Sequence, residues 1–531
     1  MGVARERALE KLCSGVFDVF VIGGGIVGSR TAFDATRYGL RVALVDAGDF
    51  GGATSGSSAR LIHGGLRYLA TGDWRLVRAA LRERDVFSRL IAPHLVRPLS
   101  FVLSAAGGRR AGCAAGLLAY AALGGLRTPL PRFATPEEAA LLVPPLRAHR
   151  FASHAVFQEA TTLDSRLTLA TVRAAEISGA VVANYLRVVA MDLASDGISR
   201  VMLRGGGDTF TVRCRAVVNA TGPWVDRLRE MESGSCASMV RLSKGVHVVL
   251  RPDEPWKAAV AVSLEGGRHL YAVPSQGTIL LGTTDVPYDG DPAAVAAEPE
   301  EISNLLDNAE QFLHPEALRG ERVISAFAGL RALPRGEEEP RHARRDHLLS
   351  VGAGGMVSVA GGKLTTHRLI ALDALRSLPD TVRPRRLSLS DAPLPGAGPA
   401  PVRDLRSRLD GPVWDHLFHL HGAGARKLLR YVEEVPNALD EIVPGAPDRW
   451  AQVYHAIREE WALTTEDVIY RRTTLGLRGL DTPEIRRKIC GVFESELGEG
   501  GADLISCGAS RPEMPPRGLE GNDSLSVGRG A

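Results

Sequence analysis

The sequence predicts a mixed α/β chain that opens on a parallel β–α–β unit, continues through further strands and closes with a separate helical domain. Three observations carry this prediction. A glycine-rich turn near residue 23 joins an apolar run to a helical segment, strand-like runs recur as far as residue 359, and the pattern becomes helical from about residue 402. At 531 residues, with 45% apolar and 24% charged side chains, the chain is long enough for several domains. This composition excludes a disordered or polytopic membrane protein.

The β–α–β unit is recognised by the length and spacing of its apolar residues. Phe17–Ile22 and Leu40–Val45 are short runs with one charged residue each, as is typical of buried parallel strands. Between them, Ile26–Tyr38 has helical spacing, and Gly39 follows as a C-cap. Further strand-like runs occur at Ala180–Val182, Ala216–Val218, Val246–Leu250, Thr278–Leu281 and Met356–Val359.

The turn after the first strand fits the pattern G-x-G-x-x-G, with Gly23, Gly25 and Gly28 at the glycine positions. Such glycines permit a tight turn, close approach of a pyrophosphate and close packing of helix on strand. The helix N-terminus supplies N–H donors. Asp46 ends the second strand, where a carboxylate can accept hydrogen bonds from ribose hydroxyls. The sequence therefore predicts a dinucleotide site, but the motif does not distinguish NAD from FAD.

A second candidate binding segment follows at residues 54–68. It contains Thr54, Ser55, Ser58, His63 and Gly64 before Arg67 and Tyr68. Small hydroxyl residues and glycines can place backbone donors against a planar cofactor, and an arginine can hold an anion through two hydrogen bonds. A solvated serine-rich loop is the alternative for this segment, and a structural role is equally open for His63.

Three later segments place small and polar residues after a strand, where ligands bind in α/β sheets. They are Asn219-Ala-Thr221-Gly222-Pro-Trp224, Gly282-Thr-Thr-Asp285 and Gly361-Gly362-Lys363-Leu-Thr365-Thr366. His247, in Lys244-Gly-Val-His247, has a suitable side chain for proton abstraction near neutral pH, and Arg331 adds a cation. Ordinary turns and a structural histidine are the alternatives.

The C-terminal part reads as a different domain. Asp404–Val432 and Arg449–Tyr470 have helical patterns, and Trp450, Tyr454, Ile457 and Trp461 share one helix face. A proline-rich stretch separates this part from the α/β region, and the chain ends in residues rich in Gly, Ser and Pro. We predict an N-terminal extension at 1–16, an α/β region at 17–392, a linker at 393–401, a helical domain at 402–495 and a disordered tail at 496–531.

Net charge and cysteine content limit the kinds of partner and cofactor that the chain is expected to bind. Lys plus Arg total 64 and Asp plus Glu total 61, which is too balanced for a nucleic-acid-binding protein. The six cysteines are scattered, so neither a disulfide framework nor a metal site is expected. Residues 1–16 lack the apolar core of a secretory signal, which indicates a cytoplasmic protein.

One stretch raises the question of membrane contact. Ala111–Leu126 is uncharged and is flanked by Arg109, Arg110 and Arg127. As a helix it would be roughly 24 Å long, which is shorter than the roughly 30 Å hydrocarbon core. It is therefore either a helix lying in the membrane interface or a buried helix rich in Ala and Gly.

Taken together, the ordered motifs resemble those of the FAD-dependent, membrane-associated glycerol-3-phosphate dehydrogenases. The resemblance spans about residues 17–480 and rests on the segments beginning at Gly23, Arg60, Asn219, Lys244, Gly282 and Gly361. It implies an FAD-binding Rossmann-like domain interleaved with a β-sheet substrate domain, followed by an all-helical C-terminal domain. The sequence departs from the family pattern at Arg60, where the family usually has Lys, and at Ala332, where it usually has Pro.

The resemblance also implies an activity and roles for particular residues. The reaction would be hydride transfer from C2 of glycerol 3-phosphate to N5 of noncovalent FAD, yielding dihydroxyacetone phosphate, with electrons passed to a quinone. Arg67, Tyr68 and Lys363 would hold the phosphate, and His247 and Arg331 would lie near the C2 hydroxyl. The implied FAD-binding residues are Gly23, Gly25, Gly28, Asp46, Thr54, Ser55, Ser58, His63, Gly64, Thr221, Gly222, Gly362, Thr365 and Thr366.

Electron transfer to a quinone would suit a cytoplasmic protein attached peripherally to the cytoplasmic face of the membrane. A homodimer is compatible with the sequence, which does not fix the oligomeric state. The alternatives are an oxygen-using glycerol-3-phosphate oxidase, an FAD-dependent amine or amino-acid oxidase of related architecture, and a non-catalytic flavin-binding protein that kept the fold.

Overall fold

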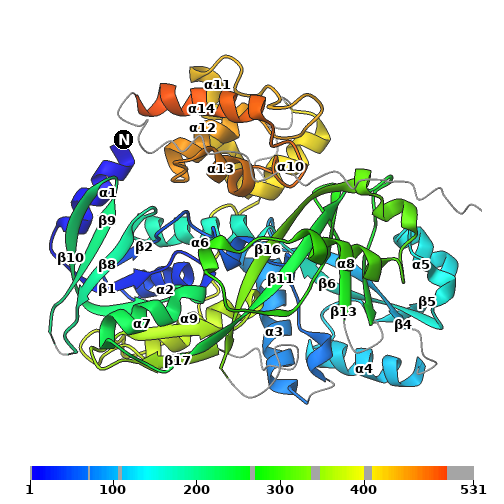
Figure 1. Cartoon of the computed structure of the whole chain (residues 1–531), viewed down its shortest axis with the longest axis horizontal. Helices are drawn as coiled ribbons and strands as arrows, with labels where there is room; N and C mark the ends of the chain where they lie inside the picture. Colours follow the sequence, from blue (N-terminus) through cyan, green and yellow to red (C-terminus); the bar gives the residue numbers. More distant parts are fainter. Residues whose placement is uncertain are drawn as a thin grey trace, which may run out of the picture.

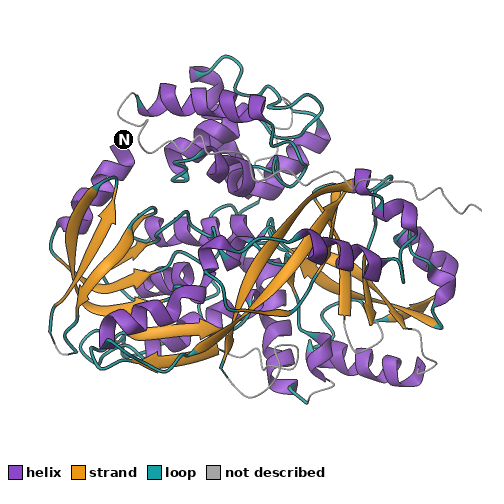
Figure 2. Cartoon of the chain, viewed as in Figure 1, coloured by secondary structure: helices purple, strands orange, loops and turns teal. Residues whose placement is uncertain are grey.

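The computed structural model describes residues 3–69, 72–105, 110–195, 197–263, 269–335, 347–399 and 409–498. Their strands form two sheets, visible as two groups of arrows in Figure 2. In Figure 1 the C-terminal helices lie together above both groups. The predicted architecture, an α/β region followed by a helical domain, is confirmed.

The first sheet has eight strands and a parallel centre. β1 lies between β10 and β2, with Phe20 opposite Val217 and Ala43. Val19 and Val21 pack against α2, α6 and α9 on one face, while Phe20 and Ile22 face the opposite core. The strands are β1 (Val16–Ile22), β2 (Val42–Val45), β7 (Val181–Ala183), β8 (Arg187–Asp192), β9 (Ser199–Gly205), β10 (Asp208–Asn219), β17 (His347–Val351) and β18 (Val357–Gly361).

The second sheet has ten strands and is mixed. Its longest pairing joins β11 to β16, with Gly245 opposite Gly329. Val246, Val248 and Leu250 form a core with α5 and α8. The strands are β3 (Leu61–Ile62), β4 (Arg97–Ala105), β5 (Arg132–Ala134), β6 (Ser153–Thr161), β11 (Val240–Leu250), β12 (Ala259–Ser263), β13 (His269–Ser275), β14 (Thr278–Gly282), β15 (Val286–Tyr288) and β16 (Val323–Pro334).

Nine α-helices belong to the part of the chain described before residue 400. They are α1 (Val3–Cys13), α2 (Ile26–Arg37), α3 (Trp74–Val86), α4 (Arg110–Leu123), α5 (Pro136–Leu142), α6 (Asp164–Ile177), α7 (Val225–Ser233), α8 (Pro299–Ala309) and α9 (His367–Arg376). α1 buries Leu12 against the first sheet, so most of the predicted N-terminal extension packs on the α/β region.

In the C-terminal domain, two of the predicted helices differ from those in the structure. It consists of α10 (Gly411–His421), the 3-10 segment η11 (Gly422–Leu429), α11 (Arg430–Glu434), α12 (Trp450–Glu459), α13 (Thr465–Asp467), the π-helical turn η12 (Val468–Arg472) and α14 (Pro483–Leu497). The expected helix over 404–432 is interrupted at Gly422, where φ is +56°, and residues 404–408 lie outside the described residues.

The expected helix over 449–470 ends at Glu459 because Trp461 turns toward the α/β region. Trp461 has a φ of +56°, and its ring meets that of Phe50 edge to face at 5.4 Å. It therefore leaves the helix face shared by Trp450 and Ile457, which pack in the C-terminal core. A contact distant in sequence overrides the helical spacing here.

The predicted boundaries of this domain also shift. Leu394, in the expected linker, is buried, and its N–H donates to the carbonyl of Ile91 (2.8 Å). Helix α14 extends to Leu497, two residues into the expected tail, and residues 499–531 lie outside the described residues. Cys490 on α14 is disulfide-bonded, which the scattered positions of the cysteines did not indicate.

Helix α4, which contains most of the uncharged stretch 111–126, is partly buried. Leu117, Tyr120 and Ala121 are buried, while Leu118 is exposed, so the helix is neither fully buried nor free of the fold. Among the described helices, none has both the length and the apolar character needed to cross a bilayer.

Candidate functional site

The glycine-rich turn after β1 opens a cradle at the N-terminus of α2. Gly23 has a φ of +106°, which favours glycine. A Cβ on Gly28 would lie 2.0 Å from the carbonyl oxygen of Gly23, so Gly28 serves close packing of helix on turn. The Ser55 hydroxyl accepts the Ile26 N–H (3.0 Å) and thereby caps α2 from the next loop.

Asp46 lies at the end of β2 beside this turn. Its carboxylate accepts the N–H of Gly24 (2.7 Å) and that of Gly48 (2.8 Å). Burial raises the pKa of Asp46 to about 6, although both N–H groups act to lower it. The ionised carboxylate retains acceptor capacity for ribose hydroxyls, as the sequence predicted.

A cavity of about 2350 Å³ runs between the two sheets and joins most of the predicted site residues. It exceeds the volume that usually holds one drug-sized ligand, so a dinucleotide and a second small molecule fit together. The predicted residues that line it are Gly23, Gly25, Asp46, Thr54, Ser55, Ser58, His63, Arg67, Tyr68, Thr221, Gly222, His247, Arg331, Gly362, Lys363 and Thr365.

Three predicted residues lie behind the cavity wall. Gly28 packs as described above, and Gly64 donates its N–H to Glu159 (3.4 Å). Thr366 is buried, and its hydroxyl donates to the carbonyl of Lys363 (3.5 Å). Their contribution is to shape the wall rather than to face a ligand.

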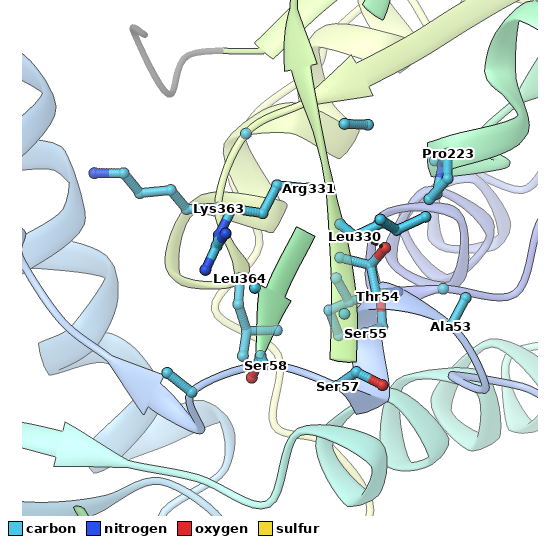
Figure 3. A pocket seen from close by; sticks show the side chains of 18 of the residues that line it. Ala53, Thr54, Ser55, Ser57, Ser58, Pro223, Leu330, Arg331, Lys363 and Leu364 are labelled. Carbon is cyan, nitrogen blue, oxygen red and sulfur yellow. Dashed lines mark hydrogen bonds between the residues drawn. The ribbon is translucent and has the colours of Figure 1, made fainter. Parts of the chain in front are cut away.

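Hydroxyl residues of the 54–58 loop are anchored to surrounding elements. Thr54 donates to the carbonyl of Leu330 (2.7 Å), and Ser58 donates to Asp164 (2.7 Å). Figure 3 shows this loop along one side of the cavity, with Arg331 and Lys363 above it. The loop is therefore anchored to its neighbours, although Thr54 is exposed and Ser55 and Ser58 are half-buried.

Arg67 and Lys363 meet at the ring of Tyr68. The Lys363 Nζ lies 3.6 Å from the ring centroid, and the Arg67 guanidinium carbon lies 4.9 Å from it. Arg67 also donates to the Tyr68 hydroxyl (3.0 Å). These residues come from segments almost 300 positions apart, yet they place two cations on one aromatic ring inside the cavity.

His247 extends from β11 into the cavity and stacks on Phe327, with ring centroids 5.1 Å apart. Neither ring nitrogen makes a hydrogen bond within the described residues. Burial, together with the charges of Arg331 and Arg60, lowers the pKa of His247 to about 3. The imidazole is consequently neutral at pH 7 and has an acceptor nitrogen free for a ligand.

Arg331 lies beside His247 and is held on three sides. It donates to the Thr283 hydroxyl (2.7 Å), the Thr284 carbonyl (3.1 Å) and Asp285 (3.4 Å). A Cβ on Gly245 would lie 2.3 Å from an Arg331 nitrogen, so the guanidinium lies across bare backbone. This arrangement fixes a cation next to a neutral imidazole.

Glu159 supports the wall and was missed by sequence reasoning. It accepts Arg84 (2.7 Å) and the Tyr120 hydroxyl, and it borders the cavity. The available signal was a lone carboxylate within an otherwise mostly uncharged strand, which usually requires a buried partner. Through Tyr120, this pair joins α4 to the backbone of the 60–68 segment.

A group with metal-ligand spacing lies at the domain interface, although no metal site was expected. It consists of His421, His455 and Glu460. Arg166 donates to both Glu460 oxygens (2.7 and 2.8 Å), so a guanidinium already neutralises the carboxylate that a metal ion would need. The arrangement is that of a buried ion pair.

Comparisons with known proteins agree with this geometry. The family model described as FAD dependent oxidoreductase matches residues 18–368, and that of the C-terminal domain of alpha-glycerophosphate oxidase matches residues 390–502. The chain is 34% identical to glycerol-3-phosphate dehydrogenase 2 of Mycobacterium tuberculosis over 94% of this chain and 88% of that protein. This chain belongs to the FAD-dependent oxidoreductases. Within them it is a member of the glycerol-3-phosphate dehydrogenase family, as the motifs indicated.

Two further relatives bear on cofactor and substrate. D-erythritol 1-phosphate dehydrogenase of Brucella abortus is 32% identical over 86% of this chain and 94% of that protein. The crystal structure of the glycerol-3-phosphate dehydrogenase from Bacillus halodurans complexed with FAD matches with a TM-score of 0.75 at 26% identity, covering 94% of this chain and 96% of that one.

The cavity of this flavoenzyme fits FAD. Gly23 and Gly25 and the α2 N-terminus form a cradle for the pyrophosphate, and Asp46 has acceptor capacity for the ribose. At the far end, Thr365 accepts the His63 N–H (3.1 Å) and orders the segment that precedes Arg67. His247 borders the same cavity, and its ring nitrogens have no hydrogen-bond partner among the described residues.

The affinity of this flavoenzyme for FAD should fall in acid. An ionised Asp46 can accept ribose hydroxyls through either oxygen, and protonation through a pKa of about 6 would turn one of these oxygens into a donor. Lowering the pH from 8 to 5 should therefore raise the Kd of FAD by about tenfold, measured by flavin fluorescence on titrating the apoprotein. Asp46→Asn should bind weakly at both pH values, and an equal acid loss in that variant would contradict the assignment.

Proposed function

We propose that this chain oxidises sn-glycerol 3-phosphate to dihydroxyacetone phosphate with a noncovalently held FAD as hydride acceptor. The observation that carries the proposal is the pair of cations on Tyr68, Arg67 and Lys363, in the cavity that also receives His247. A phosphate dianion requires clustered cations, and oxidation of an alcohol requires a proton acceptor.

The residues divide the work as follows. Lys363 and Arg67 bind the phosphate and fix the distance of C2 from the chemistry. The neutral His247 accepts the proton of the C2 hydroxyl, and Arg331 stabilises negative charge as it develops on that oxygen. The glycine turn after β1 and Asp46 would hold FAD, which would supply the two-electron oxidant for the C2 hydrogen.

The charge of the substrate assists the proton acceptor. Arg331 and Arg60 disfavour protonated His247 in the free protein. A phosphate dianion entering the cavity offsets part of this repulsion and raises the proton affinity of the imidazole. Binding of the substrate therefore makes His247 a stronger base.

The amino-acid oxidase alternative has less support. Such a substrate carries one carboxylate and one amine, so a site for it needs an acceptor for the amine. Asp285 borders the cavity and is a candidate acceptor for such an amine. Its carboxylate, however, already accepts hydrogen bonds from Ser243 and Arg331. The D-erythritol 1-phosphate dehydrogenase relative, by its name, acts on another phosphorylated polyol, which favours that substrate class.

We further propose a quinone as electron acceptor and a peripheral contact with the cytoplasmic face of the membrane. Leu118, Leu126, Leu130 and Phe133 are exposed on and after α4. Arg127 and Arg132, in the same stretch, are also exposed. Apolar side chains beside arginines suit an interface with anionic lipid headgroups.

The test is anaerobic addition of glycerol 3-phosphate to purified holoprotein while the visible absorbance of oxidised flavin is followed. We expect bleaching, and then faster recovery on addition of a quinone in anionic vesicles than on addition of oxygen. Recovery with oxygen alone would indicate an oxidase. Bleaching only by an amino acid would replace the proposed substrate, and no bleaching at all would indicate a non-catalytic flavoprotein.

A further inference from the structure

The loop after β2 is held by two arginines of the C-terminal domain. This loop, residues 46–52, carries Asp46 and borders the cavity. Asp49 within it accepts Arg472 (Nη2 to Oδ1, 2.8 Å), and its other oxygen contacts both Arg471 and Arg472. Arg472 and Asp49 are buried, so this is an ion-pair cluster shielded from water.

Side chains on both sides of the interface complete the network. Asn184 donates to Asp49 (3.1 Å) and to the carbonyl of Trp461 (2.8 Å). Asp467 accepts Arg471 (2.5 Å) and the Tyr185 hydroxyl (2.6 Å). The loop thus has one arrangement, fixed by groups from two domains.

Arg471 belongs to the C-terminal domain, and its side chain reaches from there to the cavity. It borders the cavity together with Asp46, Asp49 and Tyr185. Its charge acts to lower the pKa of Asp46, opposing the effects of burial and of the neighbouring Asp49. With Arg472 it also holds the pKa of Asp49 below its ordinary value, although burial acts in the opposite direction.

The same interface contains a comparison pair that lies away from the cavity. Arg166 on α6 binds both oxygens of Glu460 and approaches His421 (3.2 Å). Arg166 and Glu460 do not border the cavity. Both ion pairs join the same domains, but only the Arg471 side chain borders the cavity. The backbone carbonyl of Glu460 accepts Arg472 (2.6 Å), and replacing the Arg166 side chain leaves that contact in place.

We propose that Arg471 is a positioning residue of the cofactor site, through which the C-terminal domain holds the 46–52 loop in the shape that binds the adenosine half of FAD. The ligand class is the ribose of a dinucleotide, with Asp46 as its acceptor. Retention of FAD is therefore a property of both domains.

The test measures the Kd of FAD for apoproteins by flavin fluorescence, along with thermal unfolding of the holoproteins. Arg471→Gln should raise the Kd about 30-fold or more, as expected when one partner of a buried charge pair is removed. Arg471→Lys should recover part of this loss.

Arg166→Gln is the matched control, and Arg173→Gln replaces it if that variant does not fold. Arg173 bridges α6 to Glu459 (2.8 Å) across the same interface. Either control should lower the unfolding temperature without changing the Kd of FAD. An unchanged Kd in Arg471→Gln, or an equal rise in the control, would overturn the proposal. Bleaching of the unmodified holoprotein by glycerol 3-phosphate is a separate measurement. If glycerol 3-phosphate does not bleach the flavin, the proposed function is refuted, and the Kd comparison still decides the role of Arg471.

Discussion

Replacing His247 with alanine should lower kcat for glycerol 3-phosphate by about 10²- to 10⁴-fold while FAD remains bound. The imidazole is neutral, buried and unpartnered among the described residues, and it faces the cavity. Without it, the C2 hydroxyl has to lose its proton to water or to a poorly placed group as the hydride leaves. The measurement is the anaerobic rate of flavin bleaching at saturating substrate.

The control for this variant is His154→Ala. His154 is also buried in the second sheet, where it bonds Ser104 (2.9 Å) and the carbonyl of Ala148 (3.1 Å), away from the cavity. Its loss should lower the unfolding temperature and leave the bleaching rate nearly unchanged. A normal bleaching rate in His247→Ala would eliminate His247 as the base.

Lys363→Met should lower kcat/KM for glycerol 3-phosphate by about 10²- to 10³-fold, mainly through KM, because it removes a buried cation from a dianion. The ammonium lies 3.6 Å from the Tyr68 ring centroid, so it is already oriented toward the site of Arg67. Steady-state kinetics with a quinone acceptor gives the two constants separately.

Glycerol, which lacks the phosphate, separates binding from chemistry in this variant. Its slow oxidation should be almost the same in Lys363→Met and in the unmodified protein, and Lys363→Arg should restore part of the loss with glycerol 3-phosphate. If glycerol oxidation falls as steeply as that of the phosphorylated substrate, Lys363 acts on the reacting carbon and not on the phosphate.

Local patterns in the sequence are sufficient to predict the β–α–β unit and its glycine turn. The apolar run of β1, the glycines and the helical spacing of α2 lie within about twenty consecutive residues, and the structure places them as expected. Asp46 follows the same logic because parallel strands end at one edge of a sheet. These features depend on residues near one another in the chain.

The second sheet depends on pairings that no local pattern encodes. β4 pairs with β12 in parallel and with β6 in the antiparallel sense, across intervals of very different length. Trp461 illustrates the same limit, since its spacing is helical while its ring packs on Phe50, over four hundred residues earlier. Here tertiary packing decides the local conformation.

Some residues around the cavity could be found from local motifs, whereas others depend on contacts between segments distant in sequence. Arg67, His247 and Lys363 lie in segments that match the family motifs, and Arg331 was named as a further cation. The cavity brings all four together. Asp49 and Arg471 were not assigned a role, because nothing in either segment indicates that residues 422 positions apart form an ion pair.

The ion pairs of Asp49 also set an order of events during synthesis. A ribosome releases the glycine turn early, but β1 has no neighbour on one side until β10 emerges, and Arg472 follows only 423 residues after Asp49. Nascent chains of intermediate length therefore expose an unfinished nucleotide cleft. Stable flavin capture therefore waits for the C-terminal domain, and chains shortened before residue 471 should accumulate as cofactor-poor protein.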